Sequence, residues 1–145
     1  MIQHLLVATD FSEPSKAALD YAIDLAKTLR AKITVVHVYE IPNFAYEGGL
    51  VSMPVEMATS IRDGAIATMK KLCDGHAGDG VSIASVVREG PPAQVIEQVA
   101  NEIGTDITVV GTHGRRGLSH LALGSVAEKI LRSSTHPVLT VRPKK

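Results

Sequence analysis

The glycine-rich segment GTHGRRGLSHLALGS, residues 111–125, contains the residues best suited to binding chemistry. It follows an apolar run and precedes a predicted helix, where backbone N–H groups and a helix N-terminus can bind an anion. Its glycines, which would let the backbone approach phosphate oxygens closely, are Gly111, Gly114, Gly117 and Gly124. Ser125 could add a hydroxyl, whereas Arg115 and Arg116 either raise the local potential or are solvated loop charges. The segment therefore predicts a phosphate-binding site.

Two familiar phosphate-binding motifs do not match this segment. A P-loop needs G-x-x-x-x-G-K-[ST], but Arg116 stands five residues after Gly111, and no Lys precedes a Ser or Thr here. A dinucleotide fingerprint follows the first strand of its fold, and the first apolar run of this chain ends in TDFS, residues 9–12. The segment is therefore neither a P-loop nor a dinucleotide site.

Other reactive side chains give weaker patterns. Asp10, which precedes Ser-x-Pro, is either a ligand for a bound molecule or an Asx-turn residue. His113 is either a switchable group beside phosphates or a donor that orients the glycine-rich segment. Cys73 lies on the presumed apolar face of a helix, which favours packing over catalysis. The other histidines lack metal-ligand spacing and no nucleophile–base pair is evident, so the sequence predicts no catalytic residue and no metal ligand.

The elements that would position these residues alternate between strand and helix. Apolar, β-branched runs predict five strands, over residues 4–9, 32–39, 81–87, 106–110 and 138–142. Capping signals and helical spacing predict four helices, one after Ser12 and the others over residues 55–76, 91–103 and 125–133. The stripe that predicts the buried face of the first helix is Ala18, Tyr21, Ala22, Leu25, Ala26 and Leu29. This order predicts an α/β fold with a parallel sheet and helices on both faces, whose ligands bind at the carboxyl ends of the strands.

Two further segments suggest interactions. Residues 40–54 are predicted to form a long loop, because they contain Pro42, Gly48, Gly49 and Pro54. The overlapping apolar segment 41–58 is a lid over a bound nucleotide, a surface for a protein partner, or a stretch that folds back on helix 55–76. The last strand, 138–142, is predicted to be a sheet edge, and an apolar edge can pair with a second copy of the chain.

Composition and charge limit the function classes. The 145 residues fit one domain, residues 1–145, and the 45% of hydrophobic residues are sufficient for a core. The formal net charge is zero, which argues against binding nucleic acid or anionic lipid through overall charge. The single cysteine points to a reducing compartment, and no apolar run approaches the roughly 18 residues of a membrane span. We therefore expect a cytoplasmic protein with neither a nucleic-acid nor a membrane partner.

The glycine spacing resembles the nucleotide-binding signature of the universal stress protein family, G-x2-G-x9-G-[ST]. Here it is Gly111, Gly114, then Gly124 followed by Ser125. The opening LLVATDFSEPSKAALDYAIDLA, the HVY that ends the second strand and the closing HPVLTVR also resemble the family. The resemblance implies an open five-stranded parallel sheet in the order 3-2-1-4-5, of the adenine nucleotide alpha-hydrolase-like type. It also implies a homodimer formed through the last strand, and ATP as ligand, with Mg²⁺ or Mn²⁺ as the accompanying ion.

The resemblance further implies the residues that contact the nucleotide. Those expected beside the adenosine and on the pocket floor are Ala8, Thr9, Asp10, Val38, Val110 and Gly111. Those expected near the phosphates are His113, Gly114, Gly124, Ser125 and Val126. One position departs from the pattern: some ATP-binding members have Thr where this chain has Ala127, so one hydroxyl contact is missing and weaker binding is expected.

These observations favour an ATP-binding stress-response protein with slow or no hydrolysis, because they predict a phosphate site but no residue that activates water. Two alternatives remain at the level of the sequence. One is an ATPase or kinase in which Asp10 and His113 are catalytic. The other is a dimeric interaction module of the same fold that binds no nucleotide.

Overall fold

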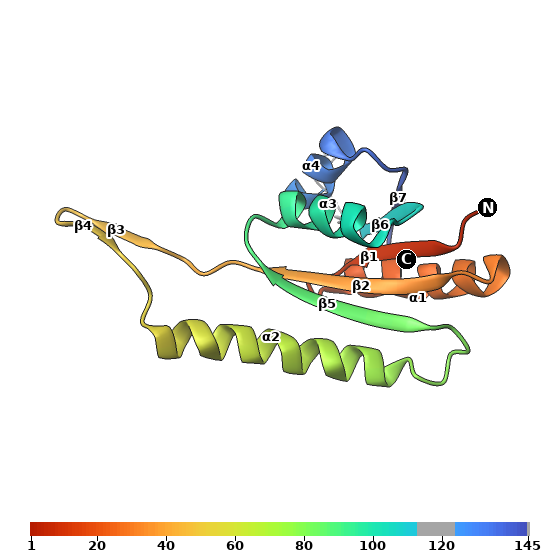
Figure 1. The fold of residues 1–145 in the computed structure, drawn as a ribbon, viewed down its shortest axis with the longest axis horizontal. Helices are drawn as coiled ribbons and strands as arrows, with labels where there is room; N and C mark the ends of the chain where they lie inside the picture. The colour runs from red at the N-terminus through yellow and green to blue at the C-terminus, as the bar shows by residue number, and fades with distance from the viewer. Residues whose placement is uncertain (113–123, 145) are drawn as a thin grey trace.

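A five-stranded sheet forms the centre of the computed structural model, which describes residues 1–112 and 124–144 (Figure 1). The strands are β1 (His4–Ala8), β2 (Lys32–Tyr39), β5 (Ile83–Glu89), β6 (Ile107–Gly111) and β7 (Val138–Val141). All neighbouring pairs are parallel, and the spatial order is β5-β2-β1-β6-β7. When only these five strands are numbered, this is the order 3-2-1-4-5, so the predicted fold class is confirmed.

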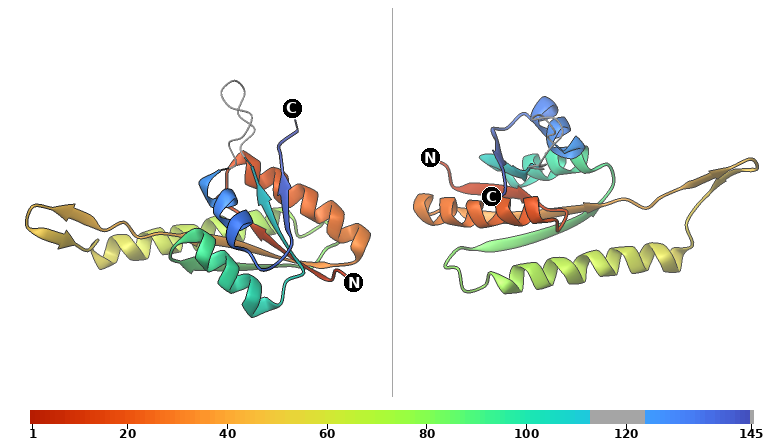
Figure 2. Two further views of the ribbon diagram at one scale, coloured as in Figure 1. Left: turned by 90° about the horizontal axis from the view of Figure 1, so that it is seen from above. Right: turned by 180° about the vertical axis from the view of Figure 1, so that it is seen from behind.

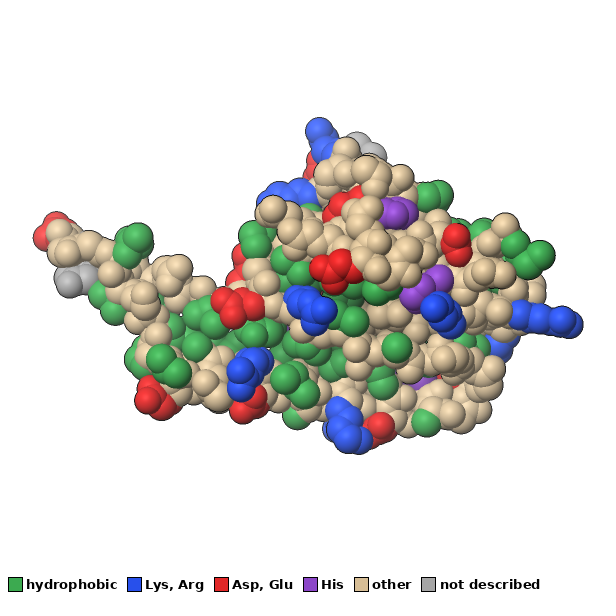
Figure 3. Space-filling view, in the orientation of Figure 1, with side chains coloured by type: hydrophobic (Ala, Val, Ile, Leu, Met, Phe, Trp, Pro, Cys, Tyr) green, Lys and Arg blue, Asp and Glu red, His purple; other side chains and the backbone are tan. Residues whose placement is uncertain are grey.

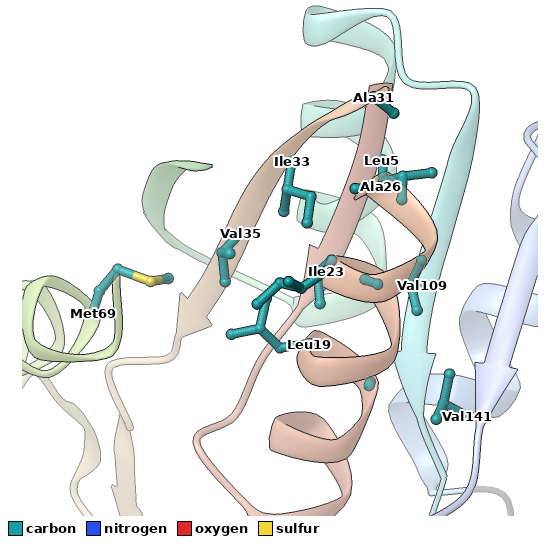
Figure 4. Close-up of a cluster of buried hydrophobic side chains, with 13 residues drawn as sticks. Leu5, Leu19, Ile23, Ala26, Ala31, Ile33, Val35, Met69, Val109 and Val141 are labelled. Atoms are coloured by element: carbon teal, nitrogen blue, oxygen red, sulfur yellow. The ribbon is translucent and has the colours of Figure 1, made fainter. Parts of the chain in front are cut away.

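Helices cover both faces of this sheet (Figure 1). They are α1 (Glu13–Leu29), α2 (Val55–Gly75), α3 (Pro92–Ile103) and α4 (Ser125–Ser133). Helices α1 and α2 pack on one face, where Leu19, Ile23 and Met69 meet strand residues such as Ile33 and Val109 (Figure 4). Helices α3 and α4 pack on the other face, over a smaller cluster that includes Leu6 and Val36. The two layers are held by the burial of aliphatic side chains.

The buried face of α1 differs from the predicted stripe. Ala18, Ala22 and Ala26 are buried as expected, but Tyr21 is 49% exposed. The core is instead filled by Leu19, which is 1% exposed and was not in the stripe. The buried positions also follow the i, i+3, i+4 spacing, but on a helix face that is rotated from the predicted one. They are Ser15, Ala18, Leu19, Ala22, Ile23 and Ala26. Tyr21 was therefore placed on the wrong side of the helix.

The predicted loop 40–54 contains a β-hairpin, which corrects that prediction. Its strands are β3 (Phe44–Tyr46) and β4 (Gly49–Val51), paired antiparallel. This hairpin, residues 44–51, is called the arm below. It projects beyond the sheet and the N-terminal end of α2 (Figure 2). Phe44 and Leu50 are 57% and 79% exposed, so the apolar stretch does not fold back on α2.

The remaining boundaries lie close to the predicted ones. The third strand of the sheet begins at Ile83 and ends at Glu89, two residues later than expected at each end. Strand β7 is an edge of the sheet, as predicted, because β6 is its one neighbour in the part of the chain that the structure describes. Within that part, no helix is long and apolar enough to cross a membrane.

Candidate functional site

A pocket opens at the carboxyl ends of β1, β2 and β6, between the sheet and the beginnings of three helices. From the strands and the turn after β1 it is lined by Ala8, Thr9, Asp10, Val38, Val110 and Gly111. From the helices it is lined by Ser12, Pro14, Pro92, Ile96, Gly124, Ser125, Val126, Ala127 and Ile130. The chain leaves β1 toward β2 on one side and reaches β6 on the other, so the pocket lies at the topological switch point of the sheet.

A compact turn after β1 forms one side of the pocket. The Phe11 N–H donates to Thr9 Oγ1 at 3.0 Å, and the Ser15 hydroxyl donates to the Ser12 carbonyl at 2.9 Å. Thr9 Oγ1 lies 3.1 Å from Ser15 Oγ, so the turn is tied to the first helical turn of α1. Ser12 precedes α1 as predicted, but its side chain makes no capping bond to the helix. The hydroxyl is used to hold Asp10 instead.

Asp10 is a carboxylate at the exposed rim of the pocket. Its Oδ1 accepts the Ser12 N–H at 3.0 Å and also the Ser12 hydroxyl. Partial burial raises the pKa of Asp10, but these bonds from Ser12, with the Ser15 hydroxyl, outweigh it and hold the pKa below its ordinary value. Asp10 is therefore ionised at neutral pH. It is an acceptor suited to hydroxyl donors and a poor base for removing a proton.

His37 contacts this turn in two ways, through a hydrogen bond to Thr9 and through the ring of Phe11. The His37 Nδ1–H donates to the Thr9 carbonyl at 2.8 Å. The rings of Phe11 and His37 lie 4.4 Å apart between centroids, tilted by 37°. Phe11 has a φ of 64°, a left-handed conformation that non-glycine residues rarely adopt. A backbone outlier of this kind persists where surrounding contacts hold it, and it often marks a functional site.

The N-terminus of α4 also lines the pocket. Gly124 precedes the helix and Ser125 begins it, with no side-chain cap on the first turn. The first N–H groups of a helix lack intrahelical partners, so this end of α4 offers donors and a favourable dipole to an anion. Gly124 has φ −53° and ψ 148°, a conformation open to any residue. The backbone conformation at this position therefore does not require glycine. The missing side chain instead leaves space beside the start of α4.

Every predicted site residue that the structure describes lines this one pocket. His113 and Gly114 lie outside the described residues, as do Arg115 and Arg116. The sequence missed the apolar wall from the helices, chiefly Pro92, Ile96 and Ile130. Those positions carry the same spacing signal as ordinary core residues, so no local pattern distinguishes them.

Neither a cluster of potential metal ligands nor a cysteine lines the pocket in the described ranges, 1–112 and 124–144. Over those ranges no group of three or more His, Cys, Asp or Glu side chains is placed to hold a metal ion. Cys73 is half-buried against the core, away from the pocket. Burial raises the pKa of its thiol, which disfavours the reactive thiolate. The predicted packing role of Cys73 agrees with this position.

Comparison with known proteins identifies a family over almost the whole chain. The profile of the universal stress protein family matches residues 1–142. Universal stress protein YxiE of Bacillus subtilis is 33% identical, covering 98% of this chain and 100% of the relative. A universal stress protein structure from Burkholderia pseudomallei is 29% identical, with a TM-score of 0.76 and coverage of 98% and 96%. A universal stress protein solved in complex with cAMP is 25% identical, with a TM-score of 0.71 and coverage of 99% and 98%.

Proposed function

Because the chain belongs to the universal stress protein family, we propose that its pocket binds ATP and that the protein acts as a nucleotide-dependent stress-response module. The observation that carries the proposal is that Asp10 and the N-terminus of α4 line the same apolar pocket. A relative of the same fold holds cAMP, a ligand with the same base and ribose. The cytoplasm remains the expected location.

The residues present fit an adenine nucleotide. Val38, Ile96 and Val110 offer apolar surface to a base, and the ionised Asp10 offers acceptor oxygens to ribose hydroxyls. Gly124, Ser125 and Val126 offer the start of a helix to phosphate. Ala127 contributes no hydroxyl here, so the fit predicts weaker binding than in relatives that have Thr.

Slow or absent hydrolysis is part of the same proposal. Among the described lining residues, Asp10 alone is ionisable, and its lowered pKa makes it a poor base toward water. An accompanying Mg²⁺ or Mn²⁺ would be held largely by the phosphates and water, as Mg²⁺ commonly is at nucleotide sites. Its role would be to neutralise phosphate charge.

Calorimetric titration of nucleotide-stripped protein with ATP tests the proposal. Wild-type protein is expected to bind, and Asp10→Ala to weaken binding by about 10- to 100-fold, because bonds to a charged acceptor contribute about 1.5–3 kcal/mol. Asp20→Ala, an exposed carboxylate on α1, is the matched control and should bind like wild type. A folded wild-type protein that releases no heat with ATP and co-purifies with no nucleotide would favour the interaction module instead.

A second substitution locates the phosphates. Gly124→Val should weaken the binding of ATP far more than the binding of adenosine, because the added methyl groups occupy space at the start of α4. The backbone conformation at residue 124 accepts a side chain, so the variant is expected to fold. Equal losses for both ligands would place the phosphates elsewhere. Rapid, repeated turnover of ATP by purified protein would support the ATPase alternative.

We also propose the arm as a surface for a protein partner. Phe44, Leu50 and Val51 are 57%, 79% and 45% exposed on it. Figure 3 shows hydrophobic side chains on the surface of the arm, at the left of the view. No Lys or Arg occurs between Lys32 and Arg62, while Glu40, Glu47 and Glu56 do, so the partner should offer an apolar groove with a basic rim. An isolated hairpin is marginally stable in water, which also favours cover by a partner.

The arm is tested by hydrogen exchange at its amides, residues 44–51. Little protection is expected in dilute protein. Protection that appears on raising the concentration of this protein alone, and that is lost in Leu50→Glu, would make the partner a second copy of the chain instead.

A further inference from the structure

His37 lies behind the pocket rather than in it. Side chains alternate between the two faces of a strand, and the next residue of β2, Val38, lines the pocket. His37 therefore points to the face covered by α1 and α2, where it is half-buried. No ligand in the pocket would need to touch it.

From that position His37 contacts the residues on both sides of Asp10. Its Nδ1 lies 2.8 Å from the Thr9 carbonyl oxygen, and a carbonyl only accepts, so Nδ1 carries the proton. Its ring packs on Phe11 with centroids 4.4 Å apart. Thr9 and Phe11 flank Asp10 directly, so the contacts with His37 fix the backbone on each side of the carboxylate.

The turn needs such support because Phe11 is in the left-handed region, with φ 64°. For a bulky residue this conformation is unfavourable, and it persists because the surroundings hold it. The Phe11 N–H is bonded to Thr9 Oγ1, and the neighbouring Ser12 N–H to Asp10 Oδ1. These bonds exist only while the turn keeps this shape. Without His37, the turn would be free to relax and Asp10 to leave its place at the rim.

We propose that His37 is a positioning residue of the nucleotide pocket, which acts through the Thr9 carbonyl and the Phe11 ring to hold Asp10 toward the ligand. The inference rests on the proposed function. It gives a role in binding to a side chain on the face of the sheet opposite the pocket, where no residue is expected to contact the ligand.

Three substitutions separate the hydrogen bond from the space that the ring fills. His37→Leu keeps apolar volume and removes the donor. His37→Asn keeps a nitrogen donor where Nδ1 lies, whereas His37→Gln carries it one bond further out. We expect about a tenfold loss of ATP affinity in His37→Leu and His37→Gln, and recovery to within about threefold of wild type in His37→Asn. His76→Leu, a half-buried histidine at the far end of α2, is the control and should bind like wild type.

A double-mutant cycle tests whether His37 acts through Asp10. In an Asp10→Ala background, adding His37→Leu should change ATP affinity by less than about twofold, because the group being positioned is gone. Hydrogen exchange without nucleotide gives a second readout, in which the Phe11 and Ser12 amides should exchange faster in His37→Leu. Circular dichroism and thermal melting would show that each variant is folded.

The outcomes separate the two proposals. If wild type binds ATP but His37→Leu binds equally well, or His37→Asn is as weak as His37→Leu, the inference is overturned and the proposed function stands. Additive losses in the cycle, or unchanged amide exchange, overturn it too. If folded wild type binds no ATP, the proposed function fails, and the inference fails with it.

Discussion

Gly111, the last residue of β6, lies against the backbone of Pro14 in the first turn of α1. A Cβ added at Gly111 would stand 2.3 Å from the Pro14 carbonyl oxygen and 2.8 Å from the Ser15 nitrogen. Real side chains do not approach backbone atoms this closely. The sequence suggests that this glycine lets the backbone approach phosphate, and the structure adds a second reason for a glycine here, which is the close approach of the helix that follows the Asp10 turn.

Gly111→Ala should therefore destabilise the protein. Because the atoms that the new methyl group meets are backbone, α1 or β6 must shift, and overpacking of this kind costs about 1–3 kcal/mol. Urea denaturation measures the change in the free energy of unfolding. Gly64→Ala is the matched control: Gly64 lies within α2 with nothing near its Cβ position, so alanine should stabilise by about 0.5–1 kcal/mol. Equal effects at the two positions would contradict this account.

A second prediction concerns a buried hydroxyl in β6. Thr108 is 1% exposed, and its Oγ1 has no hydrogen-bond partner among the residues that the structure describes. Thr108→Val, which keeps the shape and removes the hydroxyl, should stabilise by about 1 kcal/mol, because an unpaired buried polar group is costly. Thr34→Val should do the reverse, since Thr34 Oγ1 lies 2.8 Å from His4 Nε2. Thermal melting of both variants would detect the opposite signs.

The sheet and its helices were predictable because their patterns are long and regular. Five apolar runs that alternate with four predicted helices leave few ways to build a parallel sheet. The face of α1 was harder, since the helix is apolar around much of its circumference. Tyr21 and Leu19 both fit a pattern of inward-facing residues. Which of them is buried depends on how the helix packs against the sheet, and spacing along the sequence does not give this. In the structure Leu19 is the buried residue.

The arm and the pocket wall were missed for different reasons. The arm has a local signal that could have been used: two residues, Glu47 and Gly48, separate Phe44–Tyr46 from Gly49–Val51, and a two-residue connection that contains glycine is typical of a hairpin. The wall formed by Ile96 and Ile130 has none, because it depends on how far α3 and α4 stand from the sheet. The resemblance predicted lining residues at the strand ends and at the start of α4, whereas the wall from α3 and from Ile130 of α4 required the fold.

A third prediction concerns pH and the turn that connects α4 to β7. Glu97 on α3 accepts the Thr135 N–H and the Ser134 hydroxyl, each at 2.8 Å. Burial raises the pKa of Glu97, but the bonds from Thr135 and Ser134 outweigh it and lower the pKa to about 2. A carboxyl whose pKa falls on folding contributes its full stability above its unfolded pKa, and loses that contribution as pH falls toward the folded value. The contribution of Glu97 should therefore fade between pH 4.5 and about 2.

Glu97→Gln should thus destabilise by about 1–3 kcal/mol at pH 7, because bonds to a charged acceptor are replaced by weaker ones. The difference from wild type should shrink as urea denaturation is repeated at pH values from 4.5 downward. Glu102→Gln is the control: Glu102 lies on the same helix, and its ion pair with Arg88 is exposed and 3.9 Å long. A difference between wild type and Glu97→Gln that stays constant with pH would contradict the prediction.

The final prediction concerns the free edge of β7, through which we propose that two copies pair. Thr108 N–H donates to the Pro137 carbonyl and Thr112 N–H to the Val141 carbonyl, each at 2.9 Å. Backbone groups alternate in direction along a strand, so the N–H groups of Val138 and Thr140 point away from β6. They are the donors that a second copy would use.

Thr140→Pro should then prevent dimerisation, because it removes an outward donor while leaving the bonds between β6 and β7 in place. Thr140→Val keeps the N–H, favours strand structure and should remain dimeric. Sedimentation equilibrium over a range of concentrations would distinguish the two variants. If wild type is a monomer at every concentration, or if Thr140→Pro dimerises as well as Thr140→Val does, pairing through β7 is wrong. In the second case the exposed apolar arm, whose Leu50 is 79% exposed, would become the surface to test for contact between copies.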